Sequence, residues 1–84
     1  MKKIRVYSKD WCPFCDRAKA LLKHKGLDFE EINLEGKAQE AEALFAETGF
    51  RTVPQIFIGE SCVGGFQELA QLEQSGELDQ LLAN

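Results

Sequence analysis

A cysteine pair at the junction of two secondary-structure patterns constrains this chain more than any other feature. The segment Cys12-Pro13-Phe14-Cys15 follows a β-rich run and opens an amphipathic helical pattern. Two cysteines three residues apart in the first turn of a helix are close enough to form a disulfide. The N–H groups at the helix N-terminus and the positive end of the helix dipole stabilise a thiolate on the first of them. Pro13 suits the first helical position, where its missing N–H costs no hydrogen bond, so the motif predicts a redox-active dithiol.

The rest of the sequence alternates between strand and helix patterns. Strands are expected at residues 3–8, 29–34, 53–58 and 61–63, and helices at residues 13–25, at residues 37–48, from the glycine pair at 64–65 onward and at the C-terminus. The opening strand–helix–strand unit implies a parallel pair of strands, whereas the two-residue link at 59–60 makes the last pair antiparallel. We therefore expect an α/β fold, with a small mixed sheet of four strands flanked by helices, in one domain spanning residues 1–84.

Composition restricts the class of protein. The 84 residues carry a net charge of −4 at pH 7, with 44% hydrophobic and 29% charged residues, as in ordinary soluble domains. No apolar run approaches the roughly 18 residues that a membrane span needs. The basic start of the chain leads directly into a strand pattern and not into the apolar core of a secretory signal. Three cysteines without an export signal fit a reducing compartment, so we expect a cytoplasmic protein.

Charge is distributed unevenly along the chain. Residues 1–27 carry eight basic and two acidic side chains, whereas residues 28–47 carry one basic and seven acidic ones. A basic segment around the dithiol favours a thiolate and an anionic substrate, and Lys9 lies three residues before Cys12 in the same loop. The lysines of the following helix are expected to form a solvated face. Because no basic cluster with interleaved aromatic residues is present, nucleic-acid binding is not expected.

Three segments together make the chain resemble a dithiol glutaredoxin of the thioredoxin-fold superfamily. They are Cys12–Cys15 with the helical residues 17–22, Thr52-Val53-Pro54 with the strand residues 55–58, and Gly64-Gly65-Phe66. These segments have the family's relative spacing, and the resemblance covers nearly the whole chain. It implies a thioredoxin fold with a sheet order of 2-1-3-4 and a cis peptide bond before Pro54.

The resemblance also implies roles for particular residues. Cys12 is the expected nucleophile, and Cys15 is the expected resolving thiol, in thiol–disulfide exchange. Glutathione is expected as reductant and co-substrate, without a tightly bound cofactor or metal. Lys9 and Arg51 are expected at its glycine carboxylate, the backbone of Val53 at its cysteinyl part, Phe14 beside the sulfur, and the amides of Phe66 and Gln67 at its γ-glutamyl carboxylate. Thr52, Pro54 and Gly65 are expected to contribute further contacts.

Two positions depart from the family pattern. Phe14 stands where many members have a tyrosine, so any contact of that hydroxyl is lost. Gln67 stands where many members have an aspartate that pairs with the ammonium group of glutathione. Glutamine brings no charge to this position, and Glu68 is the neighbouring acid. At position 67, glutathione would therefore meet no formal counter-charge for its ammonium group.

The leading expectation is a monomeric enzyme that uses glutathione to reduce protein disulfides and protein–glutathione mixed disulfides. Ribonucleotide reductase is among its candidate target proteins. One alternative is a glutaredoxin-like hydrogen donor that thioredoxin reductase reduces. It is favoured by Gly49-Phe50-Arg51, Gly65-Phe66 and Gln67, whereas Thr52-Val53-Pro54 and the Cys12–Cys15 motif are more similar to true glutaredoxins. A second alternative is an iron–sulfur or metal carrier. In the family a bridging cluster favours sites without the proline, so Pro13 counts against it, and a zinc site lacks partners because only Cys62 and His24 remain.

Two further side chains have expected structural roles. Cys62 is expected to pack as a small hydrophobic residue, the alternative being a regulatory thiol. Trp11 is expected to shield the dithiol, the alternative being an ordinary surface aromatic residue.

Overall fold

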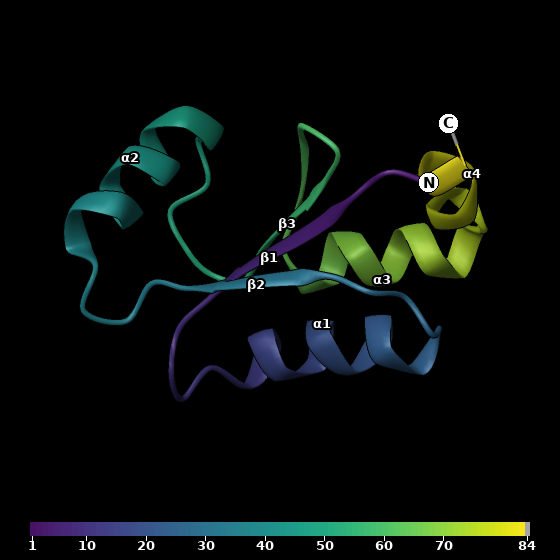
Figure 1. Cartoon of the computed structure of the whole chain (residues 1–84), viewed down its shortest axis with the longest axis horizontal. Helices are drawn as coiled ribbons and strands as arrows, with labels where there is room; N and C mark the ends of the chain where they lie inside the picture. Colours follow the sequence, from purple (N-terminus) through teal and green to yellow (C-terminus); the bar gives the residue numbers. More distant parts are fainter. Residues whose placement is uncertain (84) are drawn as a thin grey trace.

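The computed structural model describes residues 1–83, and its elements alternate in the order that the sequence predicts (Figure 1). The strands are β1 (Ile4–Ser8), β2 (Glu30–Asn33), β3 (Gln55–Ile58) and β4 (Ser61–Gly64), and the helices are α1 (Pro13–His24), α2 (Ala38–Thr48), α3 (Phe66–Ser75) and α4 (Glu77–Ala83). The sheet order is β2-β1-β3-β4, with β1 and β2 parallel and the other two pairs antiparallel. The expected mixed sheet and its order are confirmed.

The third strand is shorter than its sequence pattern indicates. We expected it over residues 53–58, but β3 begins at Gln55. Pro54 has no N–H to donate to a neighbouring strand, so the regular ladder cannot extend through it. The Val53–Pro54 peptide bond is cis, as the resemblance implied. The other elements differ from expectation by a residue or so at their ends, where boundaries are least well defined.

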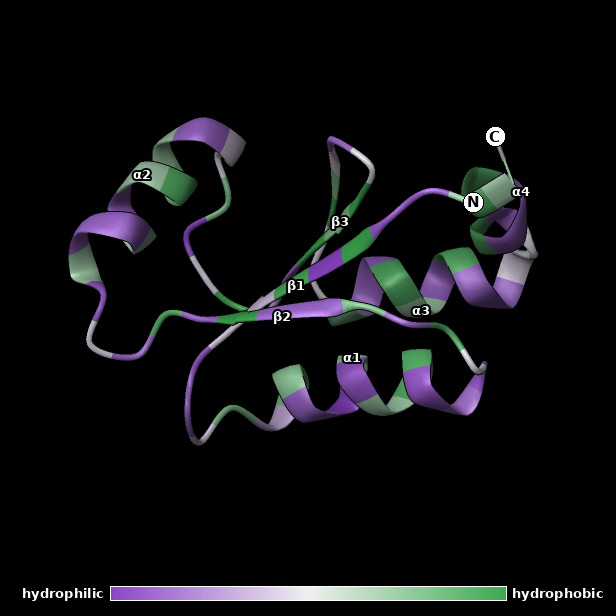
Figure 2. Cartoon of the chain, in the orientation of Figure 1, coloured by the Kyte–Doolittle hydropathy of each residue, from purple (hydrophilic) through white to green (hydrophobic). Residues whose placement is uncertain are grey.

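Two apolar clusters lie on opposite faces of the sheet. The larger one joins β1 and β3 to α1, α3 and α4, and its fully buried members include Val6, Leu22 and Leu69. The smaller one lies between the sheet and α2 and is formed by Leu34, Ala41, Leu44 and Phe57. Successive residues of a strand point to opposite faces, so Ile56 and Phe57 contribute to different clusters. Figure 1 shows α2 on the other side of the sheet from α1 and α3, and Figure 2 shows that the edge strand β2 is largely hydrophilic.

The sheet pairing brings three distant segments to one end of the molecule. Because β1 and β3 are antiparallel, Tyr7 near the end of β1 lies opposite Gln55 at the start of β3. The loop before β3 is therefore beside the loop that leads from β1 into α1. Since β4 is antiparallel to β3, its last residue Gly64 lies opposite Ile56 near the same end, and α3 begins there. Residues 9–15, 52–54 and 64–68 thus meet.

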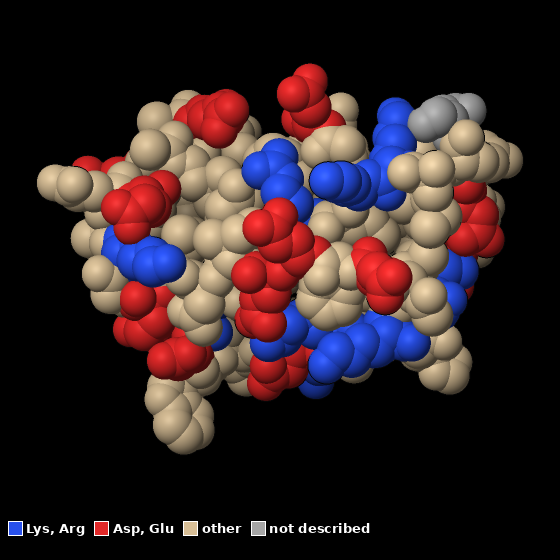
Figure 3. All heavy atoms as spheres, in the orientation of Figure 1, with Lys and Arg blue, Asp and Glu red and all other residues tan. Residues whose placement is uncertain are grey.

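The outer surface has no strongly one-signed face in the view of Figure 3. Basic and acidic side chains are interspersed there over β1, β2 and α1. Two of the ion pairs join α1 to its neighbours: Lys19 contacts Glu31 of β2 at 2.9 Å, and Lys25, which follows α1, contacts Glu73 of α3 at 2.7 Å. None of the described helices is long and apolar enough to cross a membrane.

Candidate redox-active site

The cysteine pair lies at the N-terminus of α1, where the motif predicts it. Cys12 and Cys15 are joined as a disulfide, and their Cα atoms are 5.2 Å apart. Cys12 is the N-cap residue of the helix, and its Sγ accepts the backbone N–H of Cys15 at 3.1 Å. After reduction, that N–H and the helix dipole stabilise a negative charge on the Cys12 sulfur. The N-terminus of α1 thus provides the hydrogen bond and the positive potential that stabilise a reactive thiolate.

The two cysteines differ in accessibility. Cys15 is completely buried, whereas Cys12 is partly exposed. Thiol–disulfide exchange requires direct access to the sulfur that is attacked or that attacks. The geometry therefore favours Cys12 as the sulfur that meets an external partner, with Cys15 reacting from within the protein.

The loop at Thr52-Val53-Pro54 forms one wall beside the disulfide. The carbonyl oxygen of Val53 in this loop lies 3.9 Å from Cys12 Sγ. The cis bond between Val53 and Pro54 turns the chain at this point, and Pro54 itself is buried. A stretch of main chain is thereby presented next to the reactive sulfur, where an extended ligand can pair with it.

Gln55 fixes this loop, a role that was not predicted from the sequence. Its buried side chain donates from Nε2 to the carbonyl oxygens of Phe50 and Thr52, at 3.2 and 3.1 Å, and accepts the hydroxyl of Thr48 at 3.0 Å. Both ends of the amide are satisfied, so burying it carries no unpaired polar group. A glutamine at the start of an otherwise apolar strand could have indicated this role. A buried amide side chain needs hydrogen-bond partners, and the neighbouring loop supplies them.

The start of α3 forms the facing wall. Glu68 Oε1 accepts the backbone N–H of Gly65 at 2.8 Å, which closes a capping interaction at the helix N-terminus. Gly64, with φ of +116°, allows this fold-back, because a Cβ there would lie 2.8 Å from Glu68 Cγ. The carboxylate of Glu68 therefore stands at the site although Gln67, the position that the family pattern singles out, is neutral.

These walls enclose a hollow of about 190 Å³, which we call the cysteine hollow. It is lined by Phe14, Thr52, Val53, Pro54, Gly65, Phe66, Gln67 and Glu68. The rings of Phe14 and Phe66 are tilted, with centroids 6.2 Å apart, and the guanidinium of Arg17 lies 5.3 Å from the ring of Phe14. The structure thus brings together seven of the nine residues expected to contact glutathione, and it adds Glu68.

The two expected cations lie outside the cysteine hollow. Lys9 lines a different hollow, described below, and its side chain is exposed. Arg51 is exposed in the loop immediately before Thr52. Neither lines the wall of the cysteine hollow, so any contact of theirs with a ligand comes from outside it.

Trp11 does not shield the disulfide, contrary to expectation. It is 98% exposed, and its backbone φ of 55° lies in the left-handed region. The chain turns sharply at this residue between β1 and α1, and the indole is left in solvent. It lines a second hollow of about 340 Å³, which we call the tryptophan hollow, with Lys9, Asp10, Asp16, Lys19 and Asn33.

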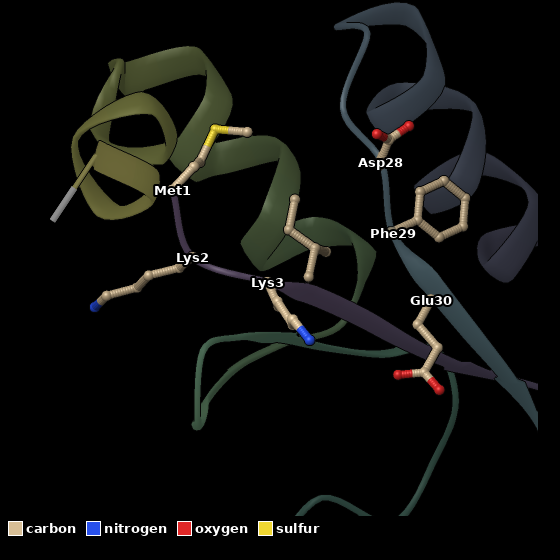
Figure 4. Close-up of a pocket in the computed structure, with 7 residues that line it drawn as sticks. Met1, Lys2, Lys3, Asp28, Phe29 and Glu30 are labelled. Atoms are coloured by element: carbon tan, nitrogen blue, oxygen red, sulfur yellow. The ribbon is translucent and has the colours of Figure 1, made fainter.

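A further hollow of about 410 Å³ lies at the start of β1, the end remote from the cysteine pair. It is lined by Met1, Lys2, Lys3, Ile4, Asp28, Phe29 and Glu30. Figure 4 shows the lysine side chains extending from the N-terminal segment and the carboxylates of Asp28 and Glu30 coming from the segment around β2. This hollow contains no thiol, and we assign it no chemistry.

The third cysteine is separate from the pair. Cys62 lies on β4, packs against the smaller apolar cluster and is a free thiol. Burial raises the pKa of its thiol, which lowers its thiolate fraction near neutral pH. This agrees with the expectation that it packs as a small hydrophobic residue. Within residues 1–83, no three His, Cys, Asp or Glu side chains are grouped as metal ligands.

Comparison with known proteins identifies the family. Residues 4–63 match the Glutaredoxin family. The chain is 48% identical over 83 residues to a glutaredoxin of Pseudomonas aeruginosa, a match that covers 99% of each chain. The chain belongs to the glutaredoxin family. Glutaredoxin 3 of Escherichia coli K12 is 44% identical over 82 residues, covering 98% of this chain and 99% of that relative.

Solved structures agree with this assignment. A buckwheat glutaredoxin–glutathione complex superimposes with a TM-score of 0.90 at 31% identity, covering 98% of this chain and 77% of that one. The solution structure of a Brucella melitensis glutaredoxin superimposes with a TM-score of 0.86 at 43% identity, covering 98% and 89%. The resemblance drawn from three short segments and the thioredoxin fold are thus confirmed. Membership of the family, together with the Cys12–Cys15 pair, makes this glutaredoxin a thiol–disulfide oxidoreductase.

Proposed function

We propose that this glutaredoxin reduces protein disulfides and protein–glutathione mixed disulfides, with glutathione as its electron donor. The supporting observation is the cysteine hollow beside the partly exposed Cys12, since its walls consist of residues expected to bind glutathione. The buckwheat relative with the same fold is itself a complex with glutathione.

The reaction begins at Cys12. In the reduced protein, the Cys12 thiolate attacks one sulfur of the substrate disulfide, a Cys12–substrate disulfide forms, and the other substrate sulfur leaves and takes up a proton. The Cys15 thiolate then attacks the Cys12 sulfur. This step forms the Cys12–Cys15 disulfide and releases the second substrate thiol, so the substrate has gained two electrons and two protons.

Glutathione then restores the dithiol. One glutathione thiolate attacks the Cys12 sulfur, which frees Cys15 and leaves a Cys12–glutathione mixed disulfide. A second glutathione thiolate attacks the sulfur of the bound glutathione, giving glutathione disulfide and the Cys12 thiolate. In the first step the charge leaves on Cys15, and in the second it leaves on Cys12, where the N–H of Cys15 stabilises it. Two glutathione thiols are oxidised for each substrate disulfide reduced.

The cysteine hollow suits the shape and charge of glutathione. The main chain at Val53 pairs with the cysteinyl backbone of the tripeptide and holds its sulfur near Cys12. The first N–H groups of α3, at Phe66 and Gln67, receive the γ-glutamyl carboxylate, as helix N-termini receive anions. Lys9 and Arg51 attract the glycine carboxylate from outside the hollow. The carboxylate of Glu68 faces the ligand's ammonium group.

The deciding experiment compares two reductants of the oxidised protein. Glutathione with glutathione reductase and NADPH is expected to sustain turnover of a glutathionylated protein, whereas thioredoxin reductase with NADPH is not. The neutral Gln67 favours thioredoxin reductase as the second candidate donor. Turnover with thioredoxin reductase alone would overturn the proposal, and visible absorbance of the freshly purified protein would point to an iron–sulfur carrier.

A further inference from the structure

Trp11 has an environment that packing does not explain. It is the most exposed large hydrophobic residue of residues 1–83, although it directly precedes Cys12. A large aromatic ring normally contributes to folding by leaving water, and this indole does not. The fold therefore gains nothing from its side chain, while the residue keeps the largest apolar surface available to a partner beside the reactive sulfur.

The backbone at Trp11 holds the indole in this position. Its φ of 55° lies in the left-handed region, which residues with a bulky side chain rarely adopt. Glycine or asparagine is the usual choice where a turn needs such a conformation. An unfavourable backbone conformation next to a reactive group is a feature from which a functional role is properly inferred.

The tryptophan hollow is distinct from the cysteine hollow. The two share no lining residue: Phe14 belongs to the cysteine hollow, and Trp11 and Asp16 belong to the tryptophan hollow. The first turn of α1, with Cys12 at its head, supplies residues to both. Glutathione in the cysteine hollow therefore reaches the tryptophan hollow only at Lys9 and leaves the indole of Trp11 free.

The polar groups of the tryptophan hollow are largely satisfied within the protein. Asp10 accepts the amide of Asn33 at 2.9 Å, and Lys19 contacts Glu31 at 2.9 Å and Asp16 at 3.7 Å. These contacts hold four of the lining side chains, Asp10, Asn33, Asp16 and Lys19, and partly offset their charges. The indole is left as the group that gains most from contact with a partner.

We propose that Trp11 is a docking residue for polypeptide substrates, contacting an apolar side chain that flanks the disulfide-bonded cysteine of the partner. The inference rests on the proposed attack by Cys12. The polypeptide chain of a partner bonded to that sulfur must lie across the protein surface around Cys12. Glutathione has three residues and is accommodated in the cysteine hollow, whereas a longer polypeptide continues beyond it. Trp11 thus distinguishes protein substrates from glutathione itself.

The test compares peptide and small disulfides in single-turnover oxidation of the prereduced protein, which requires no glutathione. Each substrate is a mixed disulfide with 2-mercaptoethanol. The leucine peptide has a cysteine flanked by leucine, the serine peptide has serine in place of that leucine, and the small disulfide contains free cysteine. Because Trp11 is the only tryptophan, the products are quenched and counted by mass spectrometry rather than followed by fluorescence.

Trp11→Ser is expected to lower the rate of reaction with the leucine peptide about tenfold, which is the effect of losing one aromatic contact. The same variant is expected to change the rates of the serine peptide and the small disulfide less than about twofold. Trp11→Phe is expected to restore most of the lost rate. Phe50→Ala, which removes another exposed aromatic ring outside both hollows, is the matched control and is expected to leave all three rates unchanged.

Two outcomes would overturn the inference. An equal loss with all three substrates would mean that Trp11 acts on the reactivity of Cys12 and not on docking. Unchanged rates with all three would make Trp11 an ordinary surface residue. Failure of glutathione to reduce the oxidised protein would instead refute the proposed electron donor and leave the single-turnover result standing.

Discussion

At the scale of single residues, the acidic group of the cysteine hollow lies one position further along α3 than the family pattern indicates. Gln67 is neutral, but Glu68 folds back over Gly65 and is the only acid among the residues that line the cysteine hollow. The shift depends on Gly64 and Gly65, since a Cβ on Gly64 would collide with the Glu68 side chain. The charge is thus supplied by a side chain that also caps the helix.

Replacing this carboxylate tests its part in binding. We expect Glu68→Gln to raise the KM for glutathione up to about fivefold at low salt, because a partly exposed ion pair contributes at most about 1 kcal/mol. The difference should shrink as salt screens the pair. Glutamine keeps an oxygen that can accept the Gly65 N–H, so thermal stability serves as the control for folding.

The reciprocal change strengthens this test. Gln67→Asp should lower the KM for glutathione modestly, since it adds charge in the first turn of α3. Steady-state kinetics at two ionic strengths measure both variants. A KM that neither substitution alters would mean that no carboxylate at the start of α3 meets the ligand.

The unequal burial of the two cysteines leads to a second prediction. Cys12→Ser is expected to abolish all disulfide reduction, because the accessible sulfur is lost. Cys15→Ser is expected to retain reduction of small glutathione mixed disulfides, where a second glutathione resolves the intermediate, and to lose reduction of protein disulfides. Cys62→Ser is the matched control and should behave as the unaltered protein. Loss of both activities in Cys15→Ser would contradict the division of roles.

At the scale of elements, Glu31 ties β2 to its two neighbours. Its Oε2 accepts the hydroxyl of the buried Ser8 on β1 at 2.7 Å and contacts Lys19 of α1 at 2.9 Å. The hydrogen bond from Lys19, followed by that from Ser8, lowers the pKa of the Glu31 carboxyl below its ordinary value of 4.5. These contacts anchor an edge strand that has little apolar surface of its own.

This lowered pKa predicts an acid-dependent loss of stability. A carboxyl whose pKa is lower in the folded state stabilises the protein above its unfolded-state pKa, and the contribution disappears as pH falls through the folded-state value. Glu31→Gln should therefore reduce the free energy of unfolding at neutral pH and have little effect well below pH 4.5. The side chain is 35% exposed, so solvent screening keeps the difference small.

Urea unfolding of the wild type and of Glu31→Gln, from neutral pH to well below pH 4.5, measures the difference in their free energies of unfolding. Glu42→Gln, at an exposed position of α2, is the control for removal of a surface charge. A difference between wild type and Glu31→Gln that stays constant with pH would show that the ion pair is not its source.

Most elements could be predicted from the sequence, because periodicity and turn residues act locally. The helix at residues 13–25 was recognisable from its N-terminal proline and its apolar spacing, and it is observed over Pro13–His24. The start of β3 could not be predicted in this way, since the largely apolar run begins at Val53 but the strand begins at Gln55. Pattern alone does not show which residues of an apolar run find a neighbouring strand.

At the scale of the whole molecule, the candidate site depends on contacts between loops that are distant in the sequence. The positions of Phe14, Val53 and Phe66 around one hollow were expected from the family resemblance and not from any local pattern. The roles of Gln55, Glu68 and Trp11 were missed or misjudged, because each depends on which loops meet at the end of the sheet. Such meetings are decided by strand register and backbone turns, which a single sequence does not display.

Gln55 provides a test at this scale. Replacing it by leucine removes the partners of Thr48 and of two loop carbonyls, at a cost of about 1–3 kcal/mol in the free energy of unfolding. The freed loop should also bind glutathione less well, so KM should rise more than kcat falls. Gln74→Leu, at an exposed position of α3, should alter neither quantity. Full stability in Gln55→Leu would show that the loop is held by other contacts.

The position of Cys15 one helical turn from Cys12 also determines how long a substrate protein stays attached. In the proposed reaction, the sulfur that releases a bound substrate protein is carried by the same rigid helix turn as the sulfur that captured it. Release of the substrate protein is then a first-order reaction. Its rate is high because the Cys15 thiol is already positioned beside the mixed disulfide, which gives it a high effective molarity. The lifetime of a complex that Cys15 resolves is therefore set by the protein, whereas the Cys12–glutathione intermediate waits for a second glutathione.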